Sequence, residues 1–104
     1  MIIDSHQHFW NYNPVRDVWT DKSMEVIKKD FLPKDLKPIL IQNEVDGCVA
    51  IQADQSEEET KFLLACAKKN SFIKGVVGWV DLTAKDVDKR LAHYASNSIF
   101  KGVR

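Results

Sequence analysis

Two histidines and an aspartate near the start of the sequence are the residues best suited to chemistry. Asp4, His6 and His8 occupy every second position of the opening segment MIIDSHQHFW. Because successive side chains of a β-strand point to opposite faces, this spacing predicts that all three share one face of a short strand. Neutral imidazole is a good ligand for zinc and related metals, so His6 and His8 are candidate ligands of one ion, with Asp4 fixing an imidazole tautomer beside them. The spacing alone leaves open that both rings are only hydrogen-bonded at a strand end.

Other polar residues follow the later apolar segments. Gln52, Asp81 and Arg104 each come at or just after a stretch that is predicted to be a strand. In parallel α/β folds, ligands bind at the carboxyl ends of the strands. We therefore expect these side chains to lie at the same edge of the sheet as the histidines.

Strands and helices alternate behind these residues. Residues 48–53 lack the alternation of a half-exposed strand, as expected for a strand buried on both faces, and further strands are predicted at 73–80 and 99–104. Their starts lie about 25–27 residues apart, which suits βαβ units with right-handed crossovers and a parallel sheet. Gly78, inside the second of these strands, indicates a close backbone approach or a place kept clear inside a packed interior.

Helix starts are predicted from capping signals. Ser56 and Glu59 have the spacing of a capping box, in which each side chain satisfies the other residue's backbone donor, so a structural role is assigned to this glutamate. Residues 83–86 give a second capping signal, with Leu82 and Val87 spaced as a hydrophobic staple.

An aromatic connection follows the first strand. Phe9, Trp10 and Trp19 lie on it, and either wall a binding site or pack over the edge of the core. Thr20 or Asp21 is predicted to cap a short helix that follows.

Composition narrows the class of protein. The 104 residues are 44% apolar and 29% charged, as in a globular domain, and fifteen basic residues balance fifteen acidic ones, which disfavours a nucleic-acid partner. No apolar run approaches the roughly 20 residues that span a membrane. No secretory leader precedes the first strand, and Cys48 and Cys66 have no metal-site spacing, so we expect two buried thiols in a cytoplasmic protein, with a disulfide as the lesser alternative.

These elements predict an incomplete barrel. A TIM-type (β/α)₈ barrel takes about 250 residues. Residues 1–104 are therefore predicted to be α/β, with parallel βαβ units that form the N-terminal half of such a barrel, as one portion of a single domain. The alternative is a complete small domain with an open sheet; a Rossmann fold is disfavoured because no Gly-x-Gly-x-x-Gly motif follows the first strand, and a P-loop is absent.

Several segments together carry a resemblance to a known family. They are IDSHQHFW at 3–10, DFLP at 30–33, VAIQA at 49–53, Glu59 with Leu63 and Leu64, GVVGWVDL at 75–82 and KGVR at 101–104. They are similar to amidohydrolase family 2, and within it to the sugar-lactonase branch of L-fuconolactonases and L-rhamnonolactonases. The resemblance covers essentially the whole chain.

The resemblance implies a metal-dependent type of hydrolase that opens a sugar-acid lactone. It implies that His6 and His8 meet a divalent metal, zinc before others, and that the remaining ligands and the general base, an aspartate on the last strand, lie beyond residue 104. It also leaves a metal-free site open, because some members of the branch work without metal. In that case His6 and His8 would donate hydrogen bonds to the developing oxyanion.

Two further residues are candidates for binding the lactone or a related sugar acid. Gln52 and Arg104 could bind sugar hydroxyls or a carboxylate, Arg104 through its bidentate guanidinium. The alternative is that these polar strand ends only cap loops or bind water. A different class of function also stays open: a non-catalytic α/β fragment that self-associates through its open sheet edges. In either case the 104-residue chain alone is predicted to have no substantial hydrolase activity.

Overall fold

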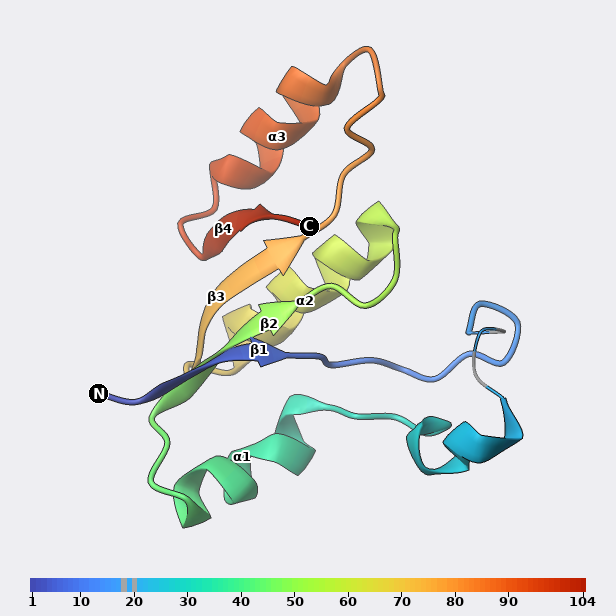
Figure 1. Cartoon of the computed structure of the whole chain (residues 1–104). Coiled ribbons are helices and arrows are strands. Elements are labelled where there is room, and N and C mark those ends of the chain that lie inside the picture. Colours follow the sequence, from blue (N-terminus) through green and yellow to red (C-terminus); the bar gives the residue numbers. More distant parts are fainter. Residues whose placement is uncertain (18, 20) are drawn as a thin grey trace.

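The computed structural model describes residues 1–17, 19 and 21–104. Strands and helices alternate along the chain (Figure 1). The elements are β1 (Ile3–Gln7), the 3₁₀ helix η1 (Lys22–Ile27), α1 (Pro33–Gln42), β2 (Gly47–Ile51), α2 (Glu57–Lys69), β3 (Ile73–Gly78), α3 (Val87–Ala95) and β4 (Phe100–Val103). None of the described helices is both long and apolar enough to cross a membrane.

The four strands form one parallel sheet in the order β1-β2-β3-β4. Figure 1 shows them as a twisted row between α1 and α3, with α2 behind. The predicted α/β class and parallel βαβ units are confirmed. In the described part of the chain, β1 and β4 are the two outer strands, and each pairs on one side only.

The core lies between the sheet and α2. β2 has four of its five residues buried and is paired with β1 on one side and β3 on the other. Its Cys48 packs in one cluster with Phe9, Leu63 and Val76, among others. Cys48 and Cys66 are both buried free thiols, as predicted, and burial raises the pKa of Cys48 to about 11.

Gly78 lets α2 approach β3 closely, as its place in the sequence predicted. A Cβ at this position would lie 2.6 Å from Cγ2 of Thr60. The Thr60 hydroxyl takes that space and bonds the chain just after β3: it donates to the Trp79 carbonyl and accepts from the Trp79 amide, both at 2.8 Å. The glycine therefore fixes the distance between helix and sheet.

The predicted start of α2 is confirmed for one half of its capping box. Ser56 Oγ accepts from the Glu59 amide at 3.2 Å. The Glu59 carboxylate does not return the bond to Ser56; its Oε2 accepts from the amides of Ala53 and Asp54, each at 3.0 Å. A buried carboxylate thus holds the loop between β2 and α2, because that loop offers two free amides where the cap offers one.

The predicted cap and staple before α3 are wrong. Thr83 donates from its amide and its hydroxyl to Asp81 Oδ1, at 2.9 and 2.6 Å, so it closes a turn instead of starting a helix. Helix α3 begins at Val87 without a side-chain cap, and Leu82 is 61% exposed, so no staple forms. Thr83 therefore bonds to the carboxylate two residues before it and does not cap the helix that follows. By contrast, Asp21 caps η1 by accepting from Ser23, as predicted, while Thr20 lies outside the described residues.

Candidate functional site

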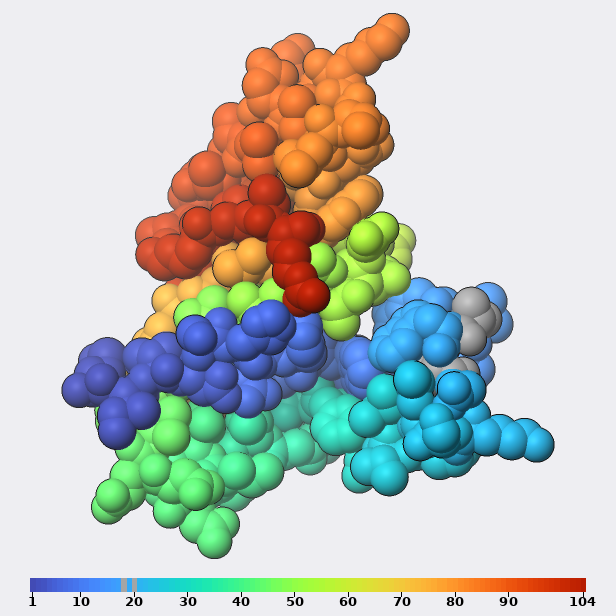
Figure 2. All heavy atoms as spheres, in the orientation of Figure 1, coloured from blue at the N-terminus to red at the C-terminus, as the bar shows by residue number. Residues whose placement is uncertain are grey.

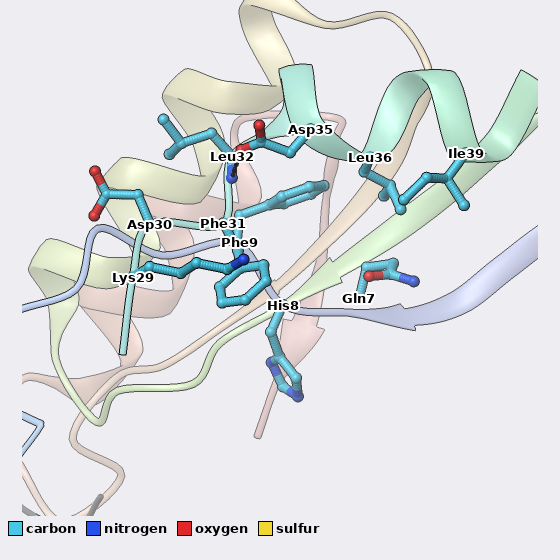
Figure 3. Close-up of a pocket in the computed structure, with 10 residues that line it drawn as sticks. All are labelled: Gln7, His8, Phe9, Lys29, Asp30, Phe31, Leu32, Asp35, Leu36 and Ile39. Atoms are coloured by element: carbon cyan, nitrogen blue, oxygen red, sulfur yellow. Dashed lines mark hydrogen bonds between the residues drawn. The ribbon is translucent and has the colours of Figure 1, made fainter. Parts of the chain in front are cut away.

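His6 and His8 meet at the carboxyl end of β1. Their Nε2 atoms are 3.1 Å apart and the rings stand nearly edge to face at 76°. The pairing of β1 with β2 slips between Asp4 and Gln7, and His8 lies just beyond the strand. Figure 3 shows the His8 ring pointing away from Leu36 and Ile39 of α1. The predicted pair is therefore real, although an irregular strand end forms it.

Neighbouring groups define which ring nitrogens carry hydrogens. His8 Nδ1 lies 2.9 Å from the carbonyl oxygen of Ile51, which can only accept, so Nδ1 is the donor and Nε2 of the neutral ring is a bare acceptor. An Arg104 guanidinium nitrogen, which can only donate, lies 3.4 Å from His6 Nε2. The two Nε2 atoms form a hydrogen bond when His6 carries its hydrogen on Nε2, and face each other as two acceptors when His6 carries it on Nδ1 and accepts from Arg104. A shared proton or a metal cation between them would resolve that contact.

The Asp4 carboxylate forms its hydrogen bonds within its own segment of the chain. Its Oδ1 accepts from the His6 amide at 3.0 Å, and its Oδ2 accepts from the Gln7 side chain. These bonds, the His6 amide first, hold the pKa of Asp4 below its usual range. Asp4 was expected to hydrogen-bond an imidazole and fix its tautomer. For His8, the Ile51 carbonyl takes that role instead.

Gln52 and Arg104 lie together beside His8. Gln52 Nε2 donates to the Arg104 carbonyl at 3.2 Å and so links the ends of β2 and β4. In Figure 2 the red C-terminal end reaches over the yellow-green part of the chain towards the blue N-terminal strand. Asp81 does not join them: its carboxylate is engaged with Thr83 in an exposed turn.

A cavity of about 420 Å³, here called the tryptophan cavity, connects these groups. It is lined by His8, Trp10, Trp19, Gln52, Ala53, Gln55 and Arg104. The Trp10 and Trp19 rings meet edge to face, with centroids 5.9 Å apart. Phe9 is buried in the core, as one of the two interpretations of the aromatic connection expected, whereas Trp10 and Trp19 line the cavity. Gln55 was missed, because its only signal in the sequence is its closeness to Gln52.

Trp10 is held firmly in that wall. Its Nε1 donates to the Lys29 carbonyl at 2.9 Å, and its backbone forms an isolated antiparallel bridge with Phe31. A second cavity, of about 400 Å³, lies on the other side of β1 against α1 (Figure 3). Its lining includes Phe9, Phe31, Leu36 and Ile39, so it is mainly apolar.

The described residues offer few side chains that could bind a metal ion together. Residues 1–17, 19 and 21–104 contain no cluster of three or more histidine, cysteine, aspartate or glutamate side chains that could hold a metal ion. Within these residues, His6 and His8 could therefore offer a metal ion two nitrogen ligands at most. A complete site needs donors from elsewhere.

Curated proteins similar to this chain carry a consistent name. The chain is 38% identical over 102 residues to the L-fucono-1,5-lactonase of Burkholderia ambifaria, which covers 98% of the chain and 35% of that protein. It is 37% identical over 97 residues to the L-fucono-1,5-lactonase of Burkholderia multivorans, covering 93% and 33%. The resemblance to the sugar-lactonase branch of amidohydrolase family 2 is confirmed. The chain spans about a third of the length of these two lactonases.

Solved structures agree on the fold. A crystal structure of an amidohydrolase from Burkholderia multivorans with bound zinc matches all of this chain and 36% of its own, at 36% identity and a TM-score of 0.94. A second crystal structure of an amidohydrolase from that organism, with bound HEPES, matches with a TM-score of 0.93. No family model matches the sequence. The four strands and their helices correspond to the N-terminal part of this amidohydrolase barrel.

Proposed function

We propose that the whole protein hydrolyses a sugar-acid lactone, with L-fucono-1,5-lactone as the first candidate, and that His6 and His8 bind a divalent metal, zinc before others. The observation that carries the proposal is the pair of imidazole Nε2 atoms 3.1 Å apart beside the tryptophan cavity. The names of the relatives support the lactone, and the zinc bound in the related crystal structure supports the metal.

The two histidines fit a metal ion by their donor chemistry. Zinc–nitrogen bonds of about 2.0–2.1 Å place two ligands of a tetrahedral site ~3.3 Å apart, close to the separation seen here. The Ile51 carbonyl fixes the His8 tautomer so that its free nitrogen faces His6. This is the outer support that metal-binding histidines commonly have.

The reaction adds water to the lactone carbonyl carbon. The ring carbon–oxygen bond then breaks, the ring oxygen takes up a proton and a hydroxy acid results. When bound, a divalent ion polarises the carbonyl or lowers the pKa of water to about 7. Arg104 can donate to the carbonyl or to the carboxylate product, and Gln52 lies within the same cavity. The general base is assigned to the part of the protein beyond residue 104. If no metal is used, His6 and His8 would instead have to donate to the oxyanion.

The test is lactone hydrolysis by the whole protein, followed by acid release from L-fucono-1,5-lactone. We expect His6→Ala to lower kcat/KM at least ~100-fold, since even groups beyond the ligands change activity by about 10- to 100-fold. The control is His93→Ala, because His93 is an exposed histidine on α3. Unchanged hydrolysis by His6→Ala would contradict the assignment. The 104-residue chain alone is expected to be inactive, and metal-dependent turnover by it would contradict that.

The alternative function, self-association, has its own support. In the described structure, β1 and β4 each leave one side of the strand without a partner, and exposed strand edges favour pairing with another chain. If the 104-residue chain associates through these edges, light scattering will give a mass above 11.9 kDa. A monodisperse monomer would count against it.

A further inference from the structure

The Gln52 side chain is buried, and one of its two polar atoms has no hydrogen-bond partner among the described residues. Gln52 is 6% exposed, and the atom in question is Oε1. The orientation of the amide follows from its other end, because the Arg104 carbonyl can only accept and so must face Nε2. A buried acceptor left without a donor is destabilising, because it has lost its hydrogen bonds to water. The position therefore favours a ligand that brings a donor.

The surroundings of Gln52 indicate what else that ligand carries. Gln52 lines the tryptophan cavity with Trp10 and Trp19, and His8 lies at the same cavity. The Trp10 indole N–H is already used by the Lys29 carbonyl, so what its ring offers the cavity is aromatic surface. Ligand sites combine such surface with a few convergent polar groups. A sugar ring has this character, with hydroxyls at its edge and C–H groups on its faces.

We propose that the tryptophan cavity binds the hydroxylated ring of the lactone, with Gln52 Oε1 accepting from a ring hydroxyl and with Trp10 and Trp19 against a C–H face. Gln52 is then a specificity residue that selects hydroxylated lactones over plain ones. His8 at the edge of the same cavity places the ester carbonyl near the histidine pair. The inference rests on the proposed function for the identity of the ligand.

The experiment compares two lactones with the whole protein and with Gln52→Met, which keeps the size of the side chain and removes its amide. The substrates are the sugar-acid lactone and δ-valerolactone, an unsubstituted lactone ring of the same size. We expect kcat/KM for the sugar lactone to fall about 10- to 100-fold, since ~1.4 kcal/mol corresponds to tenfold. The value for δ-valerolactone should change less than ~3-fold. The matched control is Gln42→Met, because Gln42 is exposed at the end of α1.

Other outcomes overturn the inference. An equal loss on both lactones would mean that Gln52 only supports the fold, and no loss on either would mean that it does not touch the substrate. Trp19→Ala is a second variant, safe for folding because Trp19 is 54% exposed, and should lower kcat/KM for both lactones; no change would remove the aromatic half of the proposal.

If the whole protein opens neither lactone, the proposed function fails, and binding then decides the inference. The probe is the sugar lactam, in which a ring nitrogen replaces the ester oxygen, measured by titration calorimetry. Binding at least tenfold weaker in Gln52→Met than in the whole wild-type protein supports the site. Equal binding, or none, overturns it.

Discussion

Replacement of Gly78 by alanine should destabilise the protein, because α2 lies against the backbone at this point. The added Cβ would lie 2.6 and 2.8 Å from Cγ2 and Oγ1 of Thr60, a residue with no exposed surface. Overpacking costs about 1–3 kcal/mol. Moving Thr60 also endangers its two hydrogen bonds to Trp79, each worth about 0.5–1.5 kcal/mol. Against this, an alanine lowers the conformational entropy of the unfolded chain, which stabilises the fold by about 0.4–1 kcal/mol. If both hydrogen bonds are lost, the net loss of stability is about 1–6 kcal/mol.

Urea denaturation of the whole protein, followed by circular dichroism, measures this loss. Gly102→Ala is the matched control in β4, since a Cβ there meets no atom of the described residues within 4 Å, and it should be neutral or slightly stabilising. Thr60→Val keeps the side-chain shape and removes only the hydrogen bonds, so it separates the two contributions. If Gly78→Ala were as stable as Gly102→Ala, the close approach of α2 to β3 would be refuted.

Two further predictions concern buried polar groups. Glu59→Gln should lower the free energy of unfolding by about 1–2 kcal/mol in urea denaturation, because its charge-assisted bonds to the Ala53 and Asp54 amides become neutral ones. The control Glu58→Gln, at an exposed position, should leave the stability unchanged. Equal effects of the two substitutions would contradict the role of Glu59. Burial, and then the bond to Glu57, raises the pKa of Tyr94 to about 12 from about 10. Because the folded pKa is the higher one, this stabilisation is complete below pH ~10 and is lost as the pH rises through about 12. The measurement is the phenolate absorbance of the wild type, from which that of Tyr94→Phe is subtracted. This difference should appear near pH 12, and at lower pH when Glu57→Gln is introduced. A difference that is already complete near pH 10 would contradict the raised pKa of Tyr94.

Local patterns predicted the elements well, because each depends on residues close in sequence. The uninterrupted run 48–53 became the buried strand β2, and Gly78 marked the approach of α2. The predicted cap before α3 failed because Thr83 has two possible local partners. It donates to Asp81 and does not accept from the start of a helix. Capping patterns cannot rank such acceptors without the turn geometry.

The sequence named His6, His8, Gln52 and Arg104, which lie close together in the fold, but it also placed Asp81 there and missed Gln55, and it gave none of the contacts between them. The spacing of His6 and His8 was sufficient to place both imidazoles together. The bond from Gln52 to the Arg104 carbonyl joins residues far apart in sequence, and the single free oxygen that it leaves on Gln52 appears only in the folded chain. The part played by Gln55 depends in the same way on the fold, since only the folded loop brings it to the cavity.

Metal content tests the central claim most directly, because the claim is that two imidazole nitrogens 3.1 Å apart share a cation. The measurement is elemental analysis of the whole protein and of its His8→Ala and His93→Ala variants after dialysis. We predict about one zinc ion per chain in the wild type and in His93→Ala, and none in His8→Ala, since the lost imidazole is a direct ligand. A full zinc content in His8→Ala, or a wild type without metal that still opens the lactone, would contradict the account.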